Sequence, residues 1–292
     1  MVKMSLYRSV FVCGIMALLL FPLSLSAQDA QAQNVEAAEK YNRGLELTRA
    51  GNLTEAIAEF QASLNLDSLN VSAWYALGTA YKRNKNYDRA EYAYQKAVTI
   101  NPRYAEAHYA RGLIQQQKES YAKAIESFGQ AINNNTDYPK AFYSMGYCHL
   151  KLKDNEKAAD AFQRATTLDS TYDKAYKNLG VALSNLGNHE EAIEAYKKAI
   201  GIKPTDGVAY YRLAAAYNKV GNHVEAINAA NSCLKHKANY APAHLELGDA
   251  YKKLGQYDNA IAEYRNAAKN PKYRRAAEYE IELLENPDKY SQ

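Results

Sequence analysis

The 292-residue sequence has little cysteine, a single tryptophan and almost no net charge. Its three cysteines include no Cys-x-x-Cys pair, which weighs against a structural zinc site. The net charge of +4 is too small to indicate a dedicated nucleic-acid surface. A content of 47% hydrophobic and 23% charged residues excludes a disordered chain, a collagen and a polytopic membrane protein. The composition therefore indicates a folded protein of one or two domains that does not bind nucleic acid.

The sequence also lacks the short motifs by which many active sites are recognised. It has no glycine-rich phosphate loop, no Gly-x-Ser-x-Gly nucleophile turn and no metalloprotease signature. No two histidines stand at metal-ligand spacing on one predicted helix. The acidic pair Glu190 and Glu191 lies at a predicted helix start, where interaction with the helix dipole explains it. We therefore expect no enzymatic activity, no catalytic residue, no metal and no cofactor.

Residues 1–27 have the layout of a secretory signal peptide. Lys3 and Arg8 precede an uncharged apolar stretch at residues 9–25, and Ala27 closes a run of small residues. This arrangement predicts export, so we expect the mature protein in the bacterial periplasm or in the medium.

The leader leaves its exact processing open. We expect cleavage after Ala27, with cleavage after Ser26 and retention as an uncleaved anchor as the alternatives. Pro22 and the shortness of the apolar stretch favour cleavage over a stable membrane span. The mature chain is then expected to begin with a polar linker at residues 28–36 and to have no stable membrane insertion.

An internal repeat organises the rest of the chain. Seven alanines recur at a constant spacing of 34 without an insertion or a deletion. A glycine or alanine stands twelve residues before each of them, and an aromatic residue stands four residues after all but one. The alanines are Ala56, Ala90, Ala124, Ala158, Ala192, Ala226 and Ala260. The offsets place each set on one face of a helix.

Each repeat predicts two antiparallel helices of about 13 residues, which cross where the small residues meet. Turn chemistry supports this division. The residues expected to end first helices are Gly51, Gly187, Gly221 and Gly255, those expected to cap second helices are Thr54, Asp88 and Asp258, and those expected to stop second helices are Pro102 and Pro204.

The pattern resembles the tetratricopeptide repeat family. The second repeat matches its motif in full, with Trp74, Leu77, Gly78, Tyr81, Tyr87, Ala90, Tyr94, Ala97 and Pro102. The resemblance implies an all-α, right-handed superhelical solenoid of seven helix-turn-helix repeats in an exported bacterial protein. The repeats are placed at residues 37–70, 71–104, 105–138, 139–172, 173–206, 207–240 and 241–273, followed by a capping helix at 274–285 and a tail at 286–292.

Histidine and cysteine are expected to pack rather than react. All histidines except His236 fall on aromatic positions of the family motif. Cys148 and Cys233 replace small inward-facing residues, and with a whole repeat between them they are expected to lie beyond disulfide reach. An intermolecular disulfide or a redox-active thiol is the alternative.

The resemblance implies that the first helices line a concave groove. Five of the seven repeats carry a tyrosine three residues before the small residue, and these form the tyrosine ladder: Tyr41, Tyr75, Tyr109, Tyr143 and Tyr211. Such a ladder offers stacking area and hydroxyl groups to an extended peptide. The alternative is that the tyrosines only cover neighbouring helices.

Basic residues are concentrated at the groove positions of the last four repeats, where eight lysines or arginines face only Glu246 and Asp249. This excess favours an acidic peptide or a C-terminal carboxylate as ligand, although a solvated helix face explains it equally well. Together with the tyrosine ladder, the predicted partner-binding residues are Lys174, Lys177, Asn178, Arg212 and Lys219.

The family's carboxylate clamp is absent. Val181 stands where the first asparagine of the clamp is needed, Arg212 replaces the second, and Pro242 and Glu246 replace the final basic pair. This departure weighs against a cytosolic chaperone adaptor.

Taken together, the sequence predicts a non-catalytic protein–protein interaction scaffold of the bacterial cell envelope. Its partner is expected to be a protein or a peptide with an extended or acidic segment. The alternative is a structural, self-assembling solenoid whose groove is unused.

Overall fold

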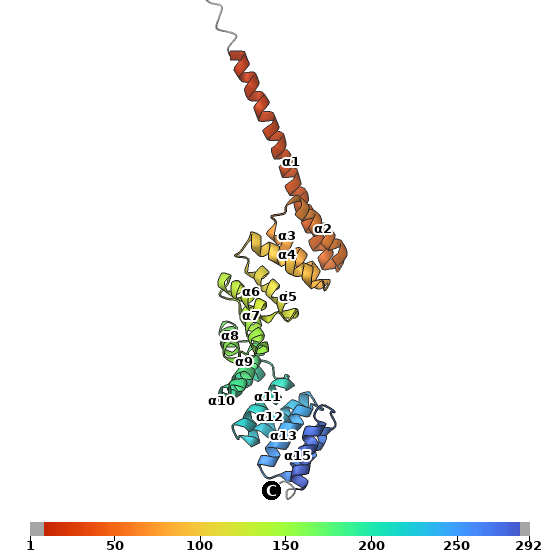
Figure 1. The fold of residues 1–292 in the computed structure, drawn as a ribbon, viewed down its shortest axis with the longest axis vertical. Helices are drawn as coiled ribbons and strands as arrows, with labels where there is room; N and C mark the ends of the chain where they lie inside the picture. Colours follow the sequence, from red (N-terminus) through yellow and green to blue (C-terminus); the bar gives the residue numbers. More distant parts are fainter. Residues whose placement is uncertain (1–8, 287–292) are drawn as a thin grey trace, which may run out of the picture. The chain divides into compact units, whose positions relative to one another are not determined.

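The computed structural model describes residues 9–286, with side chains described from residue 29 onward. Every regular element within this range is a helix, which confirms the all-α class (Figure 1). The helices are α1 (Ser9–Ala50), α2 (Leu53–Leu66), α3 (Val71–Arg83), α4 (Tyr87–Ile100), α5 (Ala105–Gln117), α6 (Tyr121–Asn134), α7 (Pro139–Lys151), α8 (Asn155–Leu168), α9 (Asp173–Leu186), α10 (His189–Ile202), α11 (Gly207–Lys219), α12 (His223–His236), α13 (Ala241–Lys253), α14 (Tyr257–Ala268) and α15 (Arg274–Glu285).

The chain divides into two compact units, one ending at Glu119 and the other beginning at Ser120. This boundary lies in the turn between α5 and α6, inside the third predicted repeat. Within each unit every helix packs against the next, and first helices of adjacent repeats also touch one another, as α11 does with both α9 and α13. The first helices of a unit therefore share one side of it, which we call the first-helix face.

The turns between paired helices repeat a single backbone conformation. One residue just after the first helix has a positive φ in all seven repeats, at Gly51, Lys85, Glu119, Lys153, Gly187, Gly221 and Gly255. The four glycines were predicted there. The three other residues were not, because a left-handed backbone is costly for a residue with a side chain and propensity alone assigns it to glycine.

The predicted helix caps are wrong by two residues. The second helices α2, α4 and α14 begin directly after Asn52, Asn86 and Gln256, and the side chain of Asn86 accepts a hydrogen bond from the backbone N–H of Arg89. Only one residue separates the left-handed position from the start of the second helix, and that residue is the N-cap. The N-cap therefore lies two residues before the predicted position. Asp88 lies inside the first turn instead, where the helix dipole favours its charge.

The second helices end as predicted at their C-termini, since α4 stops at Ile100 before Pro102 and α10 stops at Ile202 before Pro204.

Glycine at the helix crossing is required by the aromatic ring beside it. A Cβ atom added to Gly180 would lie 2.6 Å from the ring of Tyr196, and the same holds at 2.6 Å for Gly44 and Phe60. The sixth repeat is different, because its small residue is Ala214 and the aromatic position holds a buried alanine, Ala230. Removing the ring makes room for the extra methyl group, so the two positions change together.

The first helix is longer than expected, because α1 runs through residues 28–36, where a polar linker was expected. Ala, Gln and Glu favour helix, and no glycine or proline lies between Pro22 and Gly44 to interrupt it. Residues 29–36 are exposed, and the first buried residue is Ala37. The helix therefore precedes the point at which packing against the repeat begins.

The structure describes the predicted signal peptide only in part: residues 1–8 are not described, and residues 9–28 are described only as part of the backbone of α1. Within the described residues, no helix combines the length and the apolar character needed to cross a bilayer. At the other end, α15 covers residues 274–285 and buries Ala277 against the last repeat, while residues 287–292 of the predicted tail are not described.

Candidate functional site

The ladder tyrosines are half-buried side chains that also hold the repeats together. The ring of Tyr143 packs 5.7 Å from that of Phe162 on the second helix of its own repeat. It also packs 5.0 Å from Tyr172, which precedes the first helix of the next repeat. Tyr75 makes the same two contacts in the first unit, with Tyr94 and Tyr104. All five ladder tyrosines are half-buried: Tyr41, Tyr75, Tyr109, Tyr143 and Tyr211.

A second set of tyrosines was missed by sequence analysis, and three of its members, Tyr104, Tyr172 and Tyr240, pack against ladder tyrosines. These residues stand at the N-cap of a first helix, and they are Tyr104, Tyr138, Tyr172, Tyr240 and Tyr273. Tyr240 packs edge-on against Tyr211 at 5.4 Å. The signal was present in the sequence, because all of them except Tyr273 follow a ladder tyrosine at one constant spacing. Burial raises the pKa of Tyr104 to about 12, so its hydroxyl group stays protonated at neutral pH.

The fifth repeat replaces this tyrosine pair with an ion pair. Lys177 stands at the ladder position and Asp206 at the N-cap position, and Lys177 Nζ lies 2.5 Å from Asp206 Oδ2. The other oxygen of Asp206 accepts hydrogen bonds from the backbone N–H groups of Val208 and Ala209, which caps α11. Lys177 was predicted to bind a partner. In the structure its ammonium group links α9 to the N-cap of α11.

The ion pair sets the ionisation of Asp206. Burial opposes its negative charge, but the hydrogen bond and charge of Lys177, with the two backbone N–H groups, lower the pKa of Asp206 below its ordinary value. The carboxylate is therefore ionised throughout the neutral range.

Three predicted basic residues remain accessible on the first helices of the second unit. Lys174 on α9 and Arg212 and Lys219 on α11 are exposed. The guanidinium of Arg212 lies over the ring of Tyr211, 5.4 Å from its centre. No ion pair involving these three side chains is present among the residues that the structure describes. They are free to meet carboxylates of a ligand.

Asn178 is placed beside the ladder, where its Nδ2 donates a hydrogen bond to the hydroxyl oxygen of Tyr143 at 3.1 Å. The second unit thus brings together Tyr143, Asn178, Tyr211 and Arg212 on its first-helix face.

Two carboxylates occupy the end of this face. A pocket of about 300 Å³ is lined by Glu246, Asp249, Lys219 and Lys253, among others. Burial raises the pKa of Glu246, and the nearby charge of Asp249 adds to the shift. Asp249 accepts a hydrogen bond from the hydroxyl group of Tyr264 at 2.6 Å. These acidic groups interrupt the basic character predicted for the last four repeats.

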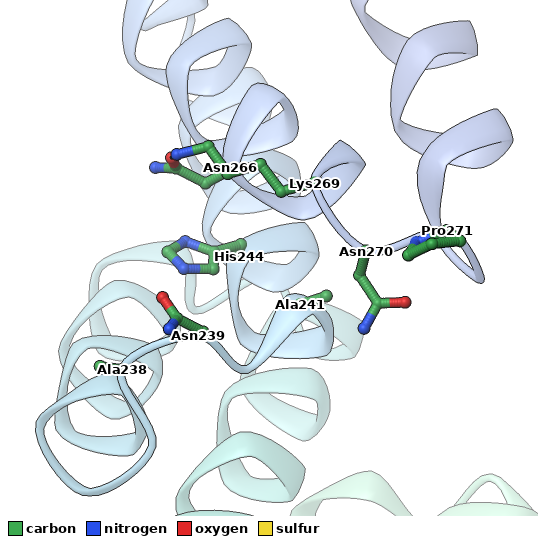
Figure 2. Close-up of a pocket in the computed structure, with 8 residues that line it drawn as sticks. All are labelled: Ala238, Asn239, Ala241, His244, Asn266, Lys269, Asn270 and Pro271. Carbon is green, nitrogen blue, oxygen red and sulfur yellow. The ribbon is translucent and has the colours of Figure 1, made fainter.

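The histidines lie apart from this face or pack within it. Figure 2 shows His244 projecting between Asn239 and Asn266 into a pocket of about 530 Å³ near the end of the second unit. Its Nδ1 lies 2.6 Å from an oxygen of Glu263. No hydroxyl or thiol side chain lines this pocket, so the pair does not face a nucleophile there. Burial lowers the pKa values of His108 and His149, which keeps both neutral at pH 7.

The two described cysteines are buried in the core of the second unit and form no disulfide with each other. Burial raises the pKa of Cys148 to about 12 and that of Cys233 to about 11, so neither forms a thiolate readily. Within the described part of the chain, no group of three or more histidine, cysteine or acidic side chains is arranged to hold a metal ion.

Sequence profiles of one family, described as "Tetratricopeptide repeat", match residues 41–105, 109–173, 173–206 and 241–270. The longest stretch left between these matches, 207–240, is the repeat in which alanines replace glycine and the aromatic ring at the crossing. A search of the curated proteins finds no match to the sequence.

Many solved structures resemble the chain. The structure of YrrB, described as "a TPR protein with an unusual peptide-binding site", has a TM-score of 0.58, is 22% identical, and covers 63% of this chain and 95% of YrrB. A MamA protein has a TM-score of 0.55, is 29% identical, and covers 59% of this chain and 93% of its own. A tetratricopeptide repeat protein from Parabacteroides merdae has a TM-score of 0.59 and is 16% identical. The match covers 86% of this chain and 99% of the Parabacteroides chain. At identities as low as those of YrrB and the Parabacteroides protein, the likeness supports the fold alone.

Proposed function

The chain belongs to the tetratricopeptide repeat family, and from that premise we propose that its second unit binds an extended, acidic segment of a partner protein on the first-helix face. Repeats of this family serve as protein–protein interaction scaffolds, and no catalytic role is part of the proposal. The single observation that carries it is a set of exposed basic side chains that form no ion pair with any described residue: Lys174, Arg212 and Lys219.

The ladder contributes contact area rather than charge. Tyr143 and Tyr211 each leave part of a ring accessible while the rest is fixed by neighbouring aromatic rings. A side chain fixed in this way loses little entropy on binding. Lys177 is left out of the binding set, because its ammonium group already meets Asp206.

The test is affinity capture with the mature protein as bait and mass spectrometry of what it retains. The variant is Arg212→Glu with Lys219→Glu, which reverses two exposed charges and leaves the Lys177 ion pair intact. A matched control is Arg164→Glu with Lys198→Glu, since these exposed residues occupy equivalent places on the second helices α8 and α10. We expect the first variant to lose a partner that the control retains. Equal recovery by both would contradict the proposal and favour self-association or another surface.

We further propose that the protein is exported and acts in the bacterial cell envelope. The proposal rests on Lys3 and Arg8 before the apolar stretch and on the small residues that end at Ala27. Cell fractionation with intact-mass measurement tests it. A periplasmic or secreted chain beginning at residue 27 or 28 is the expected result, whereas a full-length chain in the cytoplasm would contradict it.

A further inference from the structure

A cavity of about 700 Å³ opens between α2, α3 and α4 in the first unit. Its walls include Trp74, Tyr81, Tyr92 and Arg89, and its buried floor includes Leu64 and Leu77. We call it the tryptophan pocket. It is built by two second helices and the first helix between them, and it shares no residue with the binding set proposed above.

Hydrogen bonds hold the rings of the tryptophan pocket in place. The indole Nε1 of Trp74 donates to the backbone oxygen of Ser68 at 2.9 Å. The Nε2 of Gln61 donates to the hydroxyl oxygen of Tyr81 at 3.0 Å. Trp74 and Tyr92 meet edge to face, with ring centres 6.0 Å apart. The aromatic walls are therefore preorganised, which lowers the entropic cost of binding a ligand between them.

Tyr92 is not explained by the packing of the repeat. It is 58% exposed, and the other six repeats have no aromatic residue at the same place. The equivalent residues are Ala58, Glu126, Asp160, Glu194, Asn228 and Ala262. All seven repeats share one fold, and six of them have no aromatic ring at this position. The fold therefore does not require a ring there.

The tryptophan pocket carries positive charge and no negative charge. Arg89 is the one charged side chain in its lining, and its guanidinium lies over the ring of Tyr81 at 5.7 Å. Lys96, just outside, lies over the ring of Tyr92 at 5.5 Å. Within the part of the chain that the structure describes, neither side chain forms an ion pair. An occupant is thus favoured if it carries carboxylates beside an apolar group.

We propose that the tryptophan pocket binds an acidic segment of a partner protein, which places an aromatic side chain against Trp74 and Tyr92 and a carboxylate at Arg89. Edge-to-face and offset contacts between rings favour an aromatic group over an aliphatic one of similar size. The occupant is a partner protein and not the ligand of the first-helix face.

Trp74 makes this proposal directly measurable, because it is the only tryptophan in the chain. The probe is the peptide acetyl-Glu-Phe-Glu-Phe-Glu-amide, titrated into the full mature chain under selective tryptophan excitation, with calorimetry as a second readout. We expect a saturable change in emission. Replacing both phenylalanines of the probe with alanine, or its glutamates with lysine, should abolish it.

The variant that tests the site is Tyr92→Glu, since Glu126 and Glu194 show that the repeat fold accepts glutamate there. We expect it to weaken the peptide about tenfold or more, and Arg89→Gln to weaken it about threefold to tenfold. The control is Tyr279→Glu, which removes an exposed tyrosine on α15 and should leave affinity unchanged. If Tyr92→Glu does not fold, Tyr92→Ala replaces it, because Ala58 and Ala262 occupy the same position.

Four results would overturn the assignment. Equal binding by Tyr92→Glu places the peptide elsewhere, and equal binding of the lysine peptide removes the role of Arg89. Emission that is unchanged up to the solubility limit of the probe shows that this chemistry does not enter the pocket. Emission that depends on protein concentration without peptide identifies a second copy of the chain as the occupant instead.

Discussion

The fourth and fifth repeats join their neighbours at the same place with different chemistry. In the fourth, the ring of Tyr143 packs at a tilt against that of Tyr172, and in the fifth, Lys177 pairs with Asp206. Both partners change, and the link between repeats is kept. The comparison teaches that the primary role of a residue at the ladder position is to hold the repeats together. A side chain at this position is available to a ligand only to the extent that the next repeat does not use it.

The fifth and sixth repeats make the same point at the helix crossing. Gly180 lies against the ring of Tyr196, whereas Ala214 is paired with Ala230. In both comparisons a pair of positions behaves as one unit, since a change at one member requires a change at the other.

The largest effect is expected from a substitution that disrupts the crossing of the two helices in the fifth repeat. Gly180→Ala drives a methyl group into the ring of Tyr196 and should lower the free energy of unfolding by about 1–3 kcal/mol in urea denaturation. Combining it with Tyr196→Ala should cost less than the sum of the two single changes.

The matched control for this crossing is Gly201→Ala, an exposed helical site where an added Cβ meets nothing within 4 Å. It should raise stability by up to about 1 kcal/mol. If the effects of Gly180→Ala and Tyr196→Ala on the free energy of unfolding were additive in the double variant, the two crossing positions would be independent, contrary to the comparison.

The next effect concerns the ion pair of the fifth repeat. Lys177→Gln should cost about 1 kcal/mol, because the two side chains are only 24% and 12% exposed. The double change Lys177→Tyr with Asp206→Tyr recreates the pair of the fourth repeat and should be less destabilising than Asp206→Tyr alone. Thermal unfolding of the wild type and the variants tests both expectations by comparing their stabilities.

The same ion pair gives a dependence on pH with a definite sign. Since the pKa of Asp206 is lowered in the folded protein, its stabilising contribution is complete above the ordinary pKa and is lost as the pH falls through the lowered value. The difference between the wild type and Lys177→Gln should therefore narrow below about pH 4. A difference that stays constant down to strongly acidic pH would mean that the contact is not electrostatic.

A smaller effect compares two turns. Lys153 and Gly187 hold the same left-handed backbone in neighbouring repeats, with φ of 61° and 87°. Lys153→Gly should raise the free energy of unfolding by about 0.5–1 kcal/mol, and Gly187→Lys should lower it by a similar amount. Effects of the same sign would indicate that side-chain contacts, rather than backbone strain, govern these turns.

The smallest effect is at Glu246, whose pKa is raised by burial. Its charge opposes folding at neutral pH, so Glu246→Gln should stabilise slightly, within about 0.5 kcal/mol, and the gain should vanish as the carboxyl group becomes protonated. The control is Glu278→Gln, at an exposed position of α15, and it should show neither the gain in stability nor its dependence on pH. A loss of stability at neutral pH would show that the hydrogen bond from Asn218 outweighs the cost of burial.

Much of the fold follows from periodicity alone. The alanines at intervals of 34, with small and aromatic residues at fixed offsets, determine which helices pair and which faces meet. The residues Lys85 and Lys153 in left-handed turns were missed because local propensity disfavours them and only the geometry shared by all repeats imposes them. Residues 28–36 were predicted as a linker rather than a helix for the opposite reason, since their high helix propensity was overlooked.

The site was harder to predict than the fold. A charge count identifies Lys174, Arg212 and Lys219 as basic but cannot tell them from Lys177. The partner of Lys177, Asp206, lies beyond the whole of α10, at the N-cap of α11. The tryptophan pocket was also missed. Trp74 and Tyr81 match the family motif, and only the exposure of Tyr92 distinguishes their surroundings from ordinary packing.

Site-specific photocrosslinking in the cell tests the central claim, binding on the first-helix face of the second unit, most directly. A photoreactive benzoylphenylalanine replaces Ala215 on that face, where the fourth repeat already accommodates Tyr147 at the equivalent position. The control places the same group at Lys198 on the second helix α10. A partner crosslinked from position 215 and not from position 198 is the predicted result, whereas crosslinks from position 198 alone would contradict the account.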